Sequence, residues 1–285
     1  MGGRPSQSFD FGAGLAKGGG LTKFKHAIIY GDSHFPFQDN GALSVVKRAI
    51  IDIRPEVIIH IGDLIDCWSI SDFDKDPARR DTLQDNIDSA CAHLKDIYLV
   101  SPDAEHYYLE GNHEFRLTKT IQRMSEKQRE VARLRVFQTY ITWSAILHEA
   151  GVGMWQFVPA KGQARRRIFP KLIVKHGTLV RKWSGATARG EWERYGCSGV
   201  SGHTHRLGAF YHNDFNGAHG WAETGCTCDL TPEYCEDPDW QHGFLLLTFT
   251  ADYSYFAVEP VYIQAGHAIV RDKRYNQQRV SKHAP

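Results

Sequence analysis

The sequence predicts an α/β fold in which strands alternate with helices in the first half of the chain and strands dominate the second half. Two apolar runs, HAIIYGD (26–32) and EVIIHIGD (56–63), each end in Gly-Asp, and HYYLEGNHE (106–114) repeats this design. Helical patterns separate these runs. Strands that alternate with helices are typical of α/β layering.

The elements follow in order along the chain. A first helix is predicted over about 41–53, where apolar residues recur at helical spacing, and a second near 82–99. Residues 116–150 are also predicted to be helical. From residue 168 onward we predict strands in the segments IFPKLIVKHG, GVSGHTH, LGAFYHN, GFLLLTFTA and YFAVEPVYI. Functional groups gather at the carboxyl ends of strands in open α/β sheets, so we expect the chemistry of this protein at those ends.

Composition narrows the class of protein. A chain of 285 residues that is 42% hydrophobic can bury a large core. We predict a flexible glycine-rich leader over 1–23 and a single domain over 24–285 with a helical insertion near 115–150. A formal net charge of +1 favours no particular partner. Because neither a membrane span nor a secretory signal is recognisable, we expect a cytoplasmic protein without a membrane partner.

The chain has six cysteines, which without a signal indicate reduced cytosolic thiols. Cys226, Cys228 and Cys235 cluster near His242 and could form a small structural zinc site. Their spacing matches none of the common zinc patterns, so we interpret them as ordinary thiols, with the role of the cluster open.

Each predicted strand end carries side chains that can bind metal ions. The clusters are GDSH (31–34), GDLID (62–66), GNHE (111–114), KHG (175–177) and GHTH (202–205). Their glycines allow the backbone to turn sharply and to approach a ligand closely. Together the clusters supply the candidate ligands Asp32, His34, Asp63, Asn112, His176, His203 and His205.

This mixture of carboxylate, amide and imidazole groups suits divalent ions such as manganese, iron or zinc. Seven groups exceed the three or four that one catalytic zinc needs, and they suffice for two ions if one carboxylate bridges. Two ions about 3.5–4 Å apart favour in-line attack at phosphorus. The other histidines lack such a context and are interpreted as structural or surface residues, although His60 stands close to the Gly62 turn.

On these five blocks and their order, the sequence resembles the calcineurin-like metallophosphoesterase superfamily over roughly residues 26–260. The resemblance implies a four-layer α/β/β/α sandwich with two mixed sheets and a dinuclear metal site at the strand ends. It implies a first ion bound by Asp32, His34 and His205, and a second bound by Asn112, His176 and His203. Asp63 would bridge both ions, and Thr204 would turn away between its two histidine neighbours.

The resemblance also assigns a catalytic role to His113, which would protonate or stabilise the leaving oxygen. Asp66 would keep that histidine oriented and charged. Both roles are physically sensible, because an imidazolium can neutralise a departing alkoxide and a neighbouring carboxylate raises the pKa of an imidazole.

The implied activity is metal-dependent hydrolysis of phosphate esters by attack of a metal-activated hydroxide, with phosphodiesters favoured. Two divalent ions are expected, manganese first, with iron, zinc and nickel as alternatives. Ser/Thr protein phosphatases carry Arg-Gly where this chain has Cys67 and Trp68. The strings GNHEFRL and GHTHRLG are similar instead to stand-alone phosphoesterases of bacteria and their phages. A phosphomonoesterase, a protein phosphatase and a non-catalytic scaffold stay open as alternatives, and the complete site argues against the last.

A basic span from 161 to 182 contains eight Lys and Arg residues and no Asp or Glu. It leads into His176, so its loops should lie near the ions, where cations would attract an extended phosphate backbone. We therefore hypothesise a polyanionic diester substrate, with nucleic acid as the first candidate. The candidate substrate-binding residues are Arg165, Arg166, Arg167 and Arg116. The alternative is that the basic residues form a solvated face.

Overall fold

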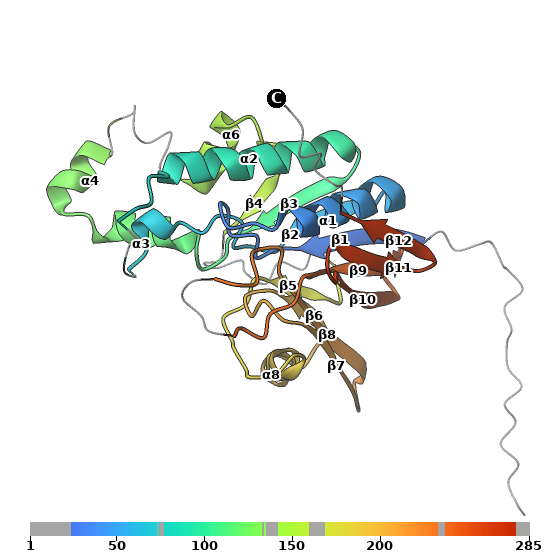
Figure 1. Cartoon of the computed structure of the whole chain (residues 1–285). Helices are drawn as coiled ribbons and strands as arrows, with labels where there is room; N and C mark the ends of the chain where they lie inside the picture. Colours follow the sequence, from blue (N-terminus) through green and yellow to red (C-terminus); the bar gives the residue numbers. More distant parts are fainter. Residues whose placement is uncertain are drawn as a thin grey trace, which may run out of the picture.

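The computed structural model describes residues 24–72, 74, 77–132, 134, 142–159, 169–232 and 237–277. In these residues the chain forms two large sheets that lie face to face, with helices on their outer sides, and a small two-stranded sheet (Figure 1). The predicted leader over 1–23 and the Arg165–Arg167 segment lie outside the described residues. No helix in the described part of the chain combines the length and the apolar character needed to cross a membrane.

The first sheet has six strands in the order β10-β9-β1-β2-β3-β4. These are β1 (Phe24–Tyr30), β2 (Val57–His60), β3 (Glu105–Leu109), β4 (Gln156–Val158), β9 (Gly243–Thr250) and β10 (Phe256–Tyr262). Strands β1 to β4 run parallel, whereas β9 and β10 are antiparallel to their neighbours. Because β1, β2 and β3 are adjacent and parallel, the segments that follow them emerge at the same edge of the sheet.

Helices α1 (Asn40–Ile53) and α2 (Leu83–Val100) cover the outer face of this sheet (Figure 1). Their apolar stripes pack into one core cluster with the sheet, represented by Ile50 of α1 and Leu94 of α2. The Asp39 side chain caps the start of α1 by accepting the Ala42 N–H. Helices α3 (Phe115–Arg123), α4 (Glu126–Ala132) and α6 (Trp143–Glu149) follow β3, where the sequence predicts helix.

The second sheet has four strands in the order β5-β6-β8-β7. These are β5 (Ile173–Lys175), β6 (Gly199–Ser201), β7 (Leu207–Asp214) and β8 (Gly217–Thr224). Its inner face packs on the first sheet in a second core cluster, and helix α8 (Ala186–Tyr195) covers its outer face around Trp221. The layers are therefore helix, sheet, sheet and helix, and the predicted four-layer sandwich is confirmed.

Some short elements are not apparent in the sequence patterns. Strand β4 has three residues, and β8 begins GAHG, which is a weak strand signal because glycine packs nothing against its neighbours. The hairpin of β11 (His267–Val270) and β12 (Lys273–Asn276) lies against α1, where the Tyr275 hydroxyl donates to Asp52 at 2.6 Å. A 3-10 turn spans Trp68–Ile70.

Candidate metal centre

The turns that carry the candidate ligands have unusual backbone geometry. A positive φ is uncommon for residues other than glycine and costs on the order of 1–3 kcal/mol. It occurs here at Asp32 (50°), His34 (51°), Asp63 (49°), His203 (73°) and His205 (59°). A Cβ on Gly111 would also overlap the Asp63 carboxylate, so only glycine fits beside it. Strain of this kind persists where the surrounding structure enforces it, which is typical of functional sites.

Asp32, His34 and His205 form the first cluster of potential ligands, and all three are buried. The His205 Nε2 atom lies 3.0 Å from His34 Nε2 and 3.4 Å from Asp32 Oδ1. The Asp32 carboxylate also accepts the backbone N–H of His203, at 3.0 and 3.1 Å. This bond ties the turn after β6 to the turn after β1, so the two sheets meet at the cluster.

Asp63, His176 and His203 form the second cluster. The His176 Nε2 atom lies 3.2 Å from Asp63 Oδ2 and 3.1 Å from the Asn112 side-chain oxygen. The other ring nitrogen of His176 contacts the Ile61 carbonyl at 3.2 Å, which fixes the ring plane. The structure thus brings four of the predicted ligands together here from four separate segments.

Asp63 faces both clusters through a single oxygen. Its Oδ2 atom lies 3.2 Å from His176 Nε2 and 3.8 Å from His34 Nε2. Its other oxygen, Oδ1, accepts the backbone N–H of His113 at 2.9 Å, which holds the carboxylate in place. A carboxylate between two sets of nitrogen and oxygen donors is the arrangement that a bridging ligand requires.

The electrostatics of the centre suit cations. Burial opposes ionisation of Asp63, but the surrounding histidines, His176 foremost, lower the pKa of that carboxyl well below its ordinary value. Burial opposes protonation of His176, yet the Asp63 carboxylate raises the pKa of His176 to about 9. Burial and the His176 charge lower the pKa of His203 to about 4. Metal ions would therefore compete with a proton at His176, and the donor set fits two divalent ions.

His113 lies beside the two clusters in contact with Asp66. Its Nδ1 atom is 3.2 Å from Asp66 Oδ2 and 2.8 Å from the Asp66 carbonyl oxygen. Asp66 Oδ2 also lies 3.0 Å from His34 Nδ1, so the Asp66 carboxylate orients both His113 and His34. Burial of the His113 ring opposes its protonation, but the carboxylates of Asp63 and Asp66 outweigh burial and raise the pKa of His113. The cationic form of this ring is thereby favoured.

Arg116 also reaches this corner of the site. Its guanidinium donates to the Asp66 carbonyl at 2.7 Å and lies 3.2 Å from His113 Nε2. Arg116, a substrate-binding candidate from the sequence, thus lies beside the predicted leaving-group histidine.

The family model for calcineurin-like phosphoesterases matches residues 26–207. The chain belongs to this family. Gene 54 proteins of the Mycobacterium phages D29 and L5 are each 28% identical to it, over 79% of this chain and 89% of their own length. A solved dimetal phosphatase from Danio rerio is 11% identical, with a TM-score of 0.43, and the match covers 89% of this chain and 99% of that structure. The resemblance inferred from the motifs is confirmed, and the family is one of metal-dependent phosphoesterases.

Glu114, the last residue of the GNHE string in this metallophosphoesterase, has a supporting role that the sequence does not predict. Its buried carboxylate accepts the backbone N–H groups of Asp63 (3.0 Å), Ile65 (3.0 Å) and Gly111 (2.8 Å). It also accepts the Tyr108 hydroxyl at 2.7 Å. Each buried donor left without a partner would cost about 1–3 kcal/mol, so Glu114 stabilises the turns that carry Asp63 and Asn112.

Glu223 of β8 performs a similar task for the GHTH turn. Its buried carboxylate accepts the Thr204 hydroxyl at 2.7 Å and the Gly185 N–H at 2.8 Å. Thr204 therefore points away from the ligand clusters, between His203 and His205. No local string around Glu223 signals this role, because the contact depends on the β6–β8 pairing.

A pocket of about 310 Å³ adjoins the second cluster. Asn112 and His176 form one side of it, and Phe115, Val158 and Tyr195 contribute apolar and aromatic surface. Lys175, part of the predicted basic span, also lines the pocket, but it is buried and pairs with Glu191 at 2.8 Å. Its charge is thus neutralised, which removes Lys175 from the predicted phosphate-attracting surface.

Proposed function

We propose that this metallophosphoesterase hydrolyses phosphodiesters at a dinuclear centre. The observation that carries the proposal is the single Asp63 oxygen that faces both clusters, at 3.2 and 3.8 Å from their histidine nitrogens. The proposed ligands of the two ions, with Asp63 between them, are Asp32, His34 and His205 on one side and Asn112, His176 and His203 on the other. Bound ions, manganese first, would neutralise phosphoryl charge and lower the pKa of a water molecule.

The side chains of the chain itself supply the rest of the chemistry. His113, held by Asp66, would deliver a proton to the leaving oxygen, and its raised pKa keeps that proton available. Arg116, beside His113, would place a second positive charge near the substrate.

The pocket favours a diester over a monoester. A diester has a second organic substituent that must occupy space next to the ions while the leaving group faces His113. The pocket beside Asn112 and His176 offers about 310 Å³ with aromatic surface from Phe115 and Tyr195. A monoester would leave this surface without a contact.

A substrate panel tests the proposal. Purified protein loaded with manganese should hydrolyse bis-nitrophenyl phosphate or a nitrophenyl nucleotide ester with a higher kcat/KM than nitrophenyl phosphate, because only the diesters fill the pocket. Rates would be measured from nitrophenolate release, with chelator-treated protein as the control. A higher kcat/KM for the monoester would overturn the diester assignment while leaving phosphoester hydrolysis in place.

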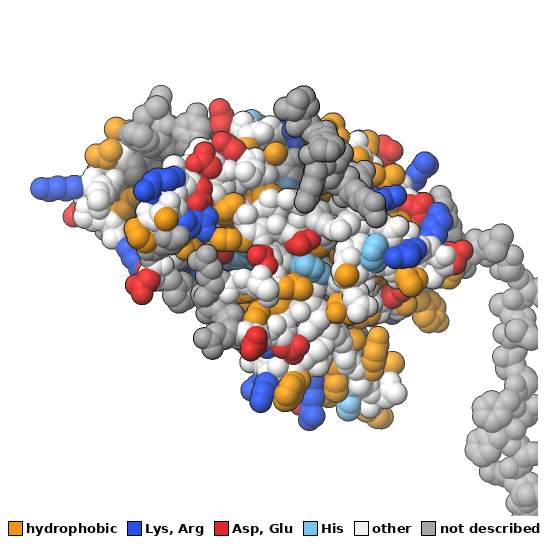
Figure 2. Space-filling model, in the orientation of Figure 1, with side chains coloured by type: hydrophobic (Ala, Val, Ile, Leu, Met, Phe, Trp, Pro, Cys, Tyr) orange, Lys and Arg blue, Asp and Glu red, His pale blue; other side chains and the backbone are white. Residues whose placement is uncertain are grey.

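The nucleic-acid hypothesis rests on the basic span and its surroundings. Figure 2 shows further Lys and Arg side chains over α3 and α4 and over α8, on the face drawn there. Some of these charges are paired, as between Arg189 and Glu193 at 2.8 Å. Paired arginines attract a phosphate backbone less than unpaired ones do. Arg165–Arg167 remain the proposed contacts for a nucleic acid that extends from the metal centre.

Replacing Arg165, Arg166 and Arg167 together by alanine should weaken DNA or RNA binding and flatten its dependence on salt, because fewer counterions are released. The turnover of a small nitrophenyl diester should change little. Binding would be followed by fluorescence anisotropy at several salt concentrations. A matched variant, Arg189→Ala, changes a paired arginine of α8 and should leave the salt slope as in the parent. A triple variant that binds like the parent would favour the solvated-face alternative.

A further inference from the structure

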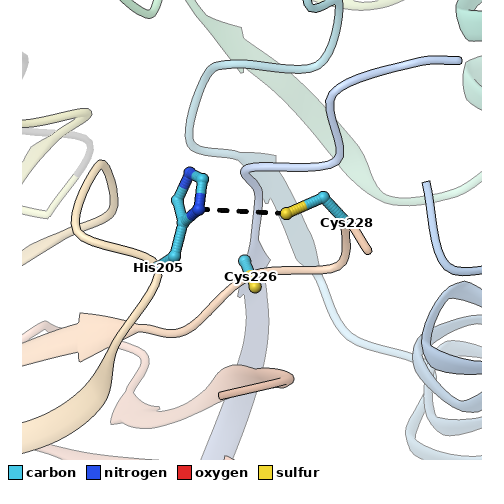
Figure 3. Close-up of side chains that lie close together, drawn as sticks. All are labelled: His205, Cys226 and Cys228. Atoms are coloured by element: carbon cyan, nitrogen blue, oxygen red, sulfur yellow. Dashed lines mark hydrogen bonds between the residues drawn. The ribbon is translucent and has the colours of Figure 1, made fainter. Parts of the chain in front are cut away.

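Two thiols follow strand β8 and lie next to a ligand of the candidate metal centre. Cys226 and Cys228 are 0% and 3% exposed, and His205 is 6% exposed. Figure 3 shows the Cys228 sulfur directed at the His205 ring, with Cys226 on the same segment of chain. The Sγ atom of Cys228 lies 3.9 Å from His205 Nδ1, the ring nitrogen that does not face Asp32.

The spacing suits a metal ion bound by one nitrogen and two sulfurs. One ligand atom from each of His205, Cys226 and Cys228 lies within 4.8 Å of the others. Zinc binds thiolate at about 2.3 Å and imidazole at about 2.0 Å, which separates ligand nitrogen and sulfur by about 3.5–3.8 Å. The observed 3.9 Å between Cys228 Sγ and His205 Nδ1 is close to this separation, and the Cys226 sulfur lies within 4.8 Å of both atoms.

Along the chain, His242 is the histidine that stands near these thiols and is their candidate partner. In the structure His242 Nε2 instead contacts the Cys228 carbonyl oxygen at 2.7 Å. Cys235 lies outside the described residues. The histidine that the fold brings to the thiols comes from the GHTH turn, which no spacing rule along the chain would identify.

Among the described residues, the contacts of the two thiols are long. The Cys226 thiol donates to the Gln241 carbonyl oxygen at 3.6 Å, and Cys228 contacts His205 at 3.9 Å and interacts with the Cys226 thiol. A thiol is a weak donor and a weak acceptor, so these contacts contribute little. Thiolates, by contrast, are strong ligands for thiophilic ions such as Zn²⁺ and Cu⁺ and poor ones for Mn²⁺.

We propose that His205, Cys226 and Cys228 form a third metal site, selective for a thiophilic d¹⁰ ion of the Zn²⁺ or Cu⁺ class. The site shares the His205 ring with the first ligand cluster. A neutral imidazole offers one lone pair, and the Nε2 atom of His205 faces Asp32 while Nδ1 faces Cys228. An ion at the thiols therefore competes for His205 with an ion in the first cluster. The proposal does not depend on which phosphoester the protein cleaves.

A cadmium titration under reducing conditions tests the site. Cd²⁺ bound by thiolates has an ultraviolet charge-transfer band that oxygen and nitrogen ligands do not produce. In the parent protein the amplitude of this band at saturating Cd²⁺ should correspond to one thiolate-bound ion per chain, because ions in the dinuclear centre do not contribute to it. Cys226→Ser and Cys228→Ser, examined separately, should each lower the band amplitude by half or more. His205→Ala should retain the thiolates but weaken Cd²⁺ binding by at least about tenfold.

Controls separate this site from the dinuclear centre. Cys197→Ser changes a thiol in another core cluster and should leave the band as in the parent. Asp63→Asn should also keep the band, even though it damages the proposed dinuclear centre. Displacement of Cd²⁺ by Zn²⁺ and by Cu⁺ in separate titrations would identify the preferred ion. A parent protein without the band at saturating Cd²⁺, or a band that survives both cysteine substitutions, would overturn the third site.

Discussion

Asp63→Asn should abolish phosphoester hydrolysis and reduce the metal content from two ions per chain to at most one. The asparagine oxygen can still accept the His113 N–H, so the fold should persist. The oxygen that faces His34 and His176 would lose its negative charge or be replaced by an NH₂ group. Loss of a residue that only hydrogen-bonds to a metal ligand typically lowers metal affinity about 10–100-fold. Loss of the ligand shared by both ions should therefore lower it more than about 100-fold.

Metal analysis after dialysis and isothermal titration with Mn²⁺ would measure this loss, and circular dichroism would confirm the fold. The matched control is Asp96→Asn, which removes an aspartate that pairs with Lys47 on the α-helical layer. That variant should bind metal like the parent. Two tightly held ions in Asp63→Asn would show that Asp63 does not bridge.

The sequence was sufficient to find the candidate ligands because each of them follows a strand directly. GDSH after β1 and GNHE after β3 are local strings, and adjacent parallel strands bring such strings together at one sheet edge. The GHTH turn belongs to the second sheet. It directly follows β6, which runs parallel to β5 and β8, so it also lies at the carboxyl end of a strand. Strand order, rather than any single motif, therefore positions the centre.

The residues that support the candidate ligands could not be predicted from the sequence. Glu114 stands inside a recognised string, but two of its four hydrogen bonds reach a distant segment, the turn that carries Asp63 and Ile65. Glu223 and Cys228 depend on β8, a strand that the sequence pattern does not predict. Their contacts with Thr204 and His205 arise from pairing across the second sheet, which hydrophobic spacing along one segment does not encode.

His113→Ala should slow hydrolysis of diesters with poor leaving groups by about 10²–10⁴-fold, because the leaving alkoxide would lose its proton donor. The loss should be much smaller for nitrophenolate, which leaves as a stable anion. The geometry supports this difference, since Asp63 and Asp66 raise the pKa of His113 and Asp66 holds its ring at 3.2 Å. Rates for a series of phenyl diesters would give the dependence on leaving-group pKa.

The variant should show a steeper dependence of rate on leaving-group pKa than the parent, while its metal content stays the same. His219→Ala provides a control, because His219 pairs with Asp214 in the β7–β8 hairpin, outside the ligand clusters. That variant should keep the parental slope and rate. Equal losses across the whole series in His113→Ala would instead assign His113 to binding the phosphate, since a positioning role affects good and poor leaving groups alike.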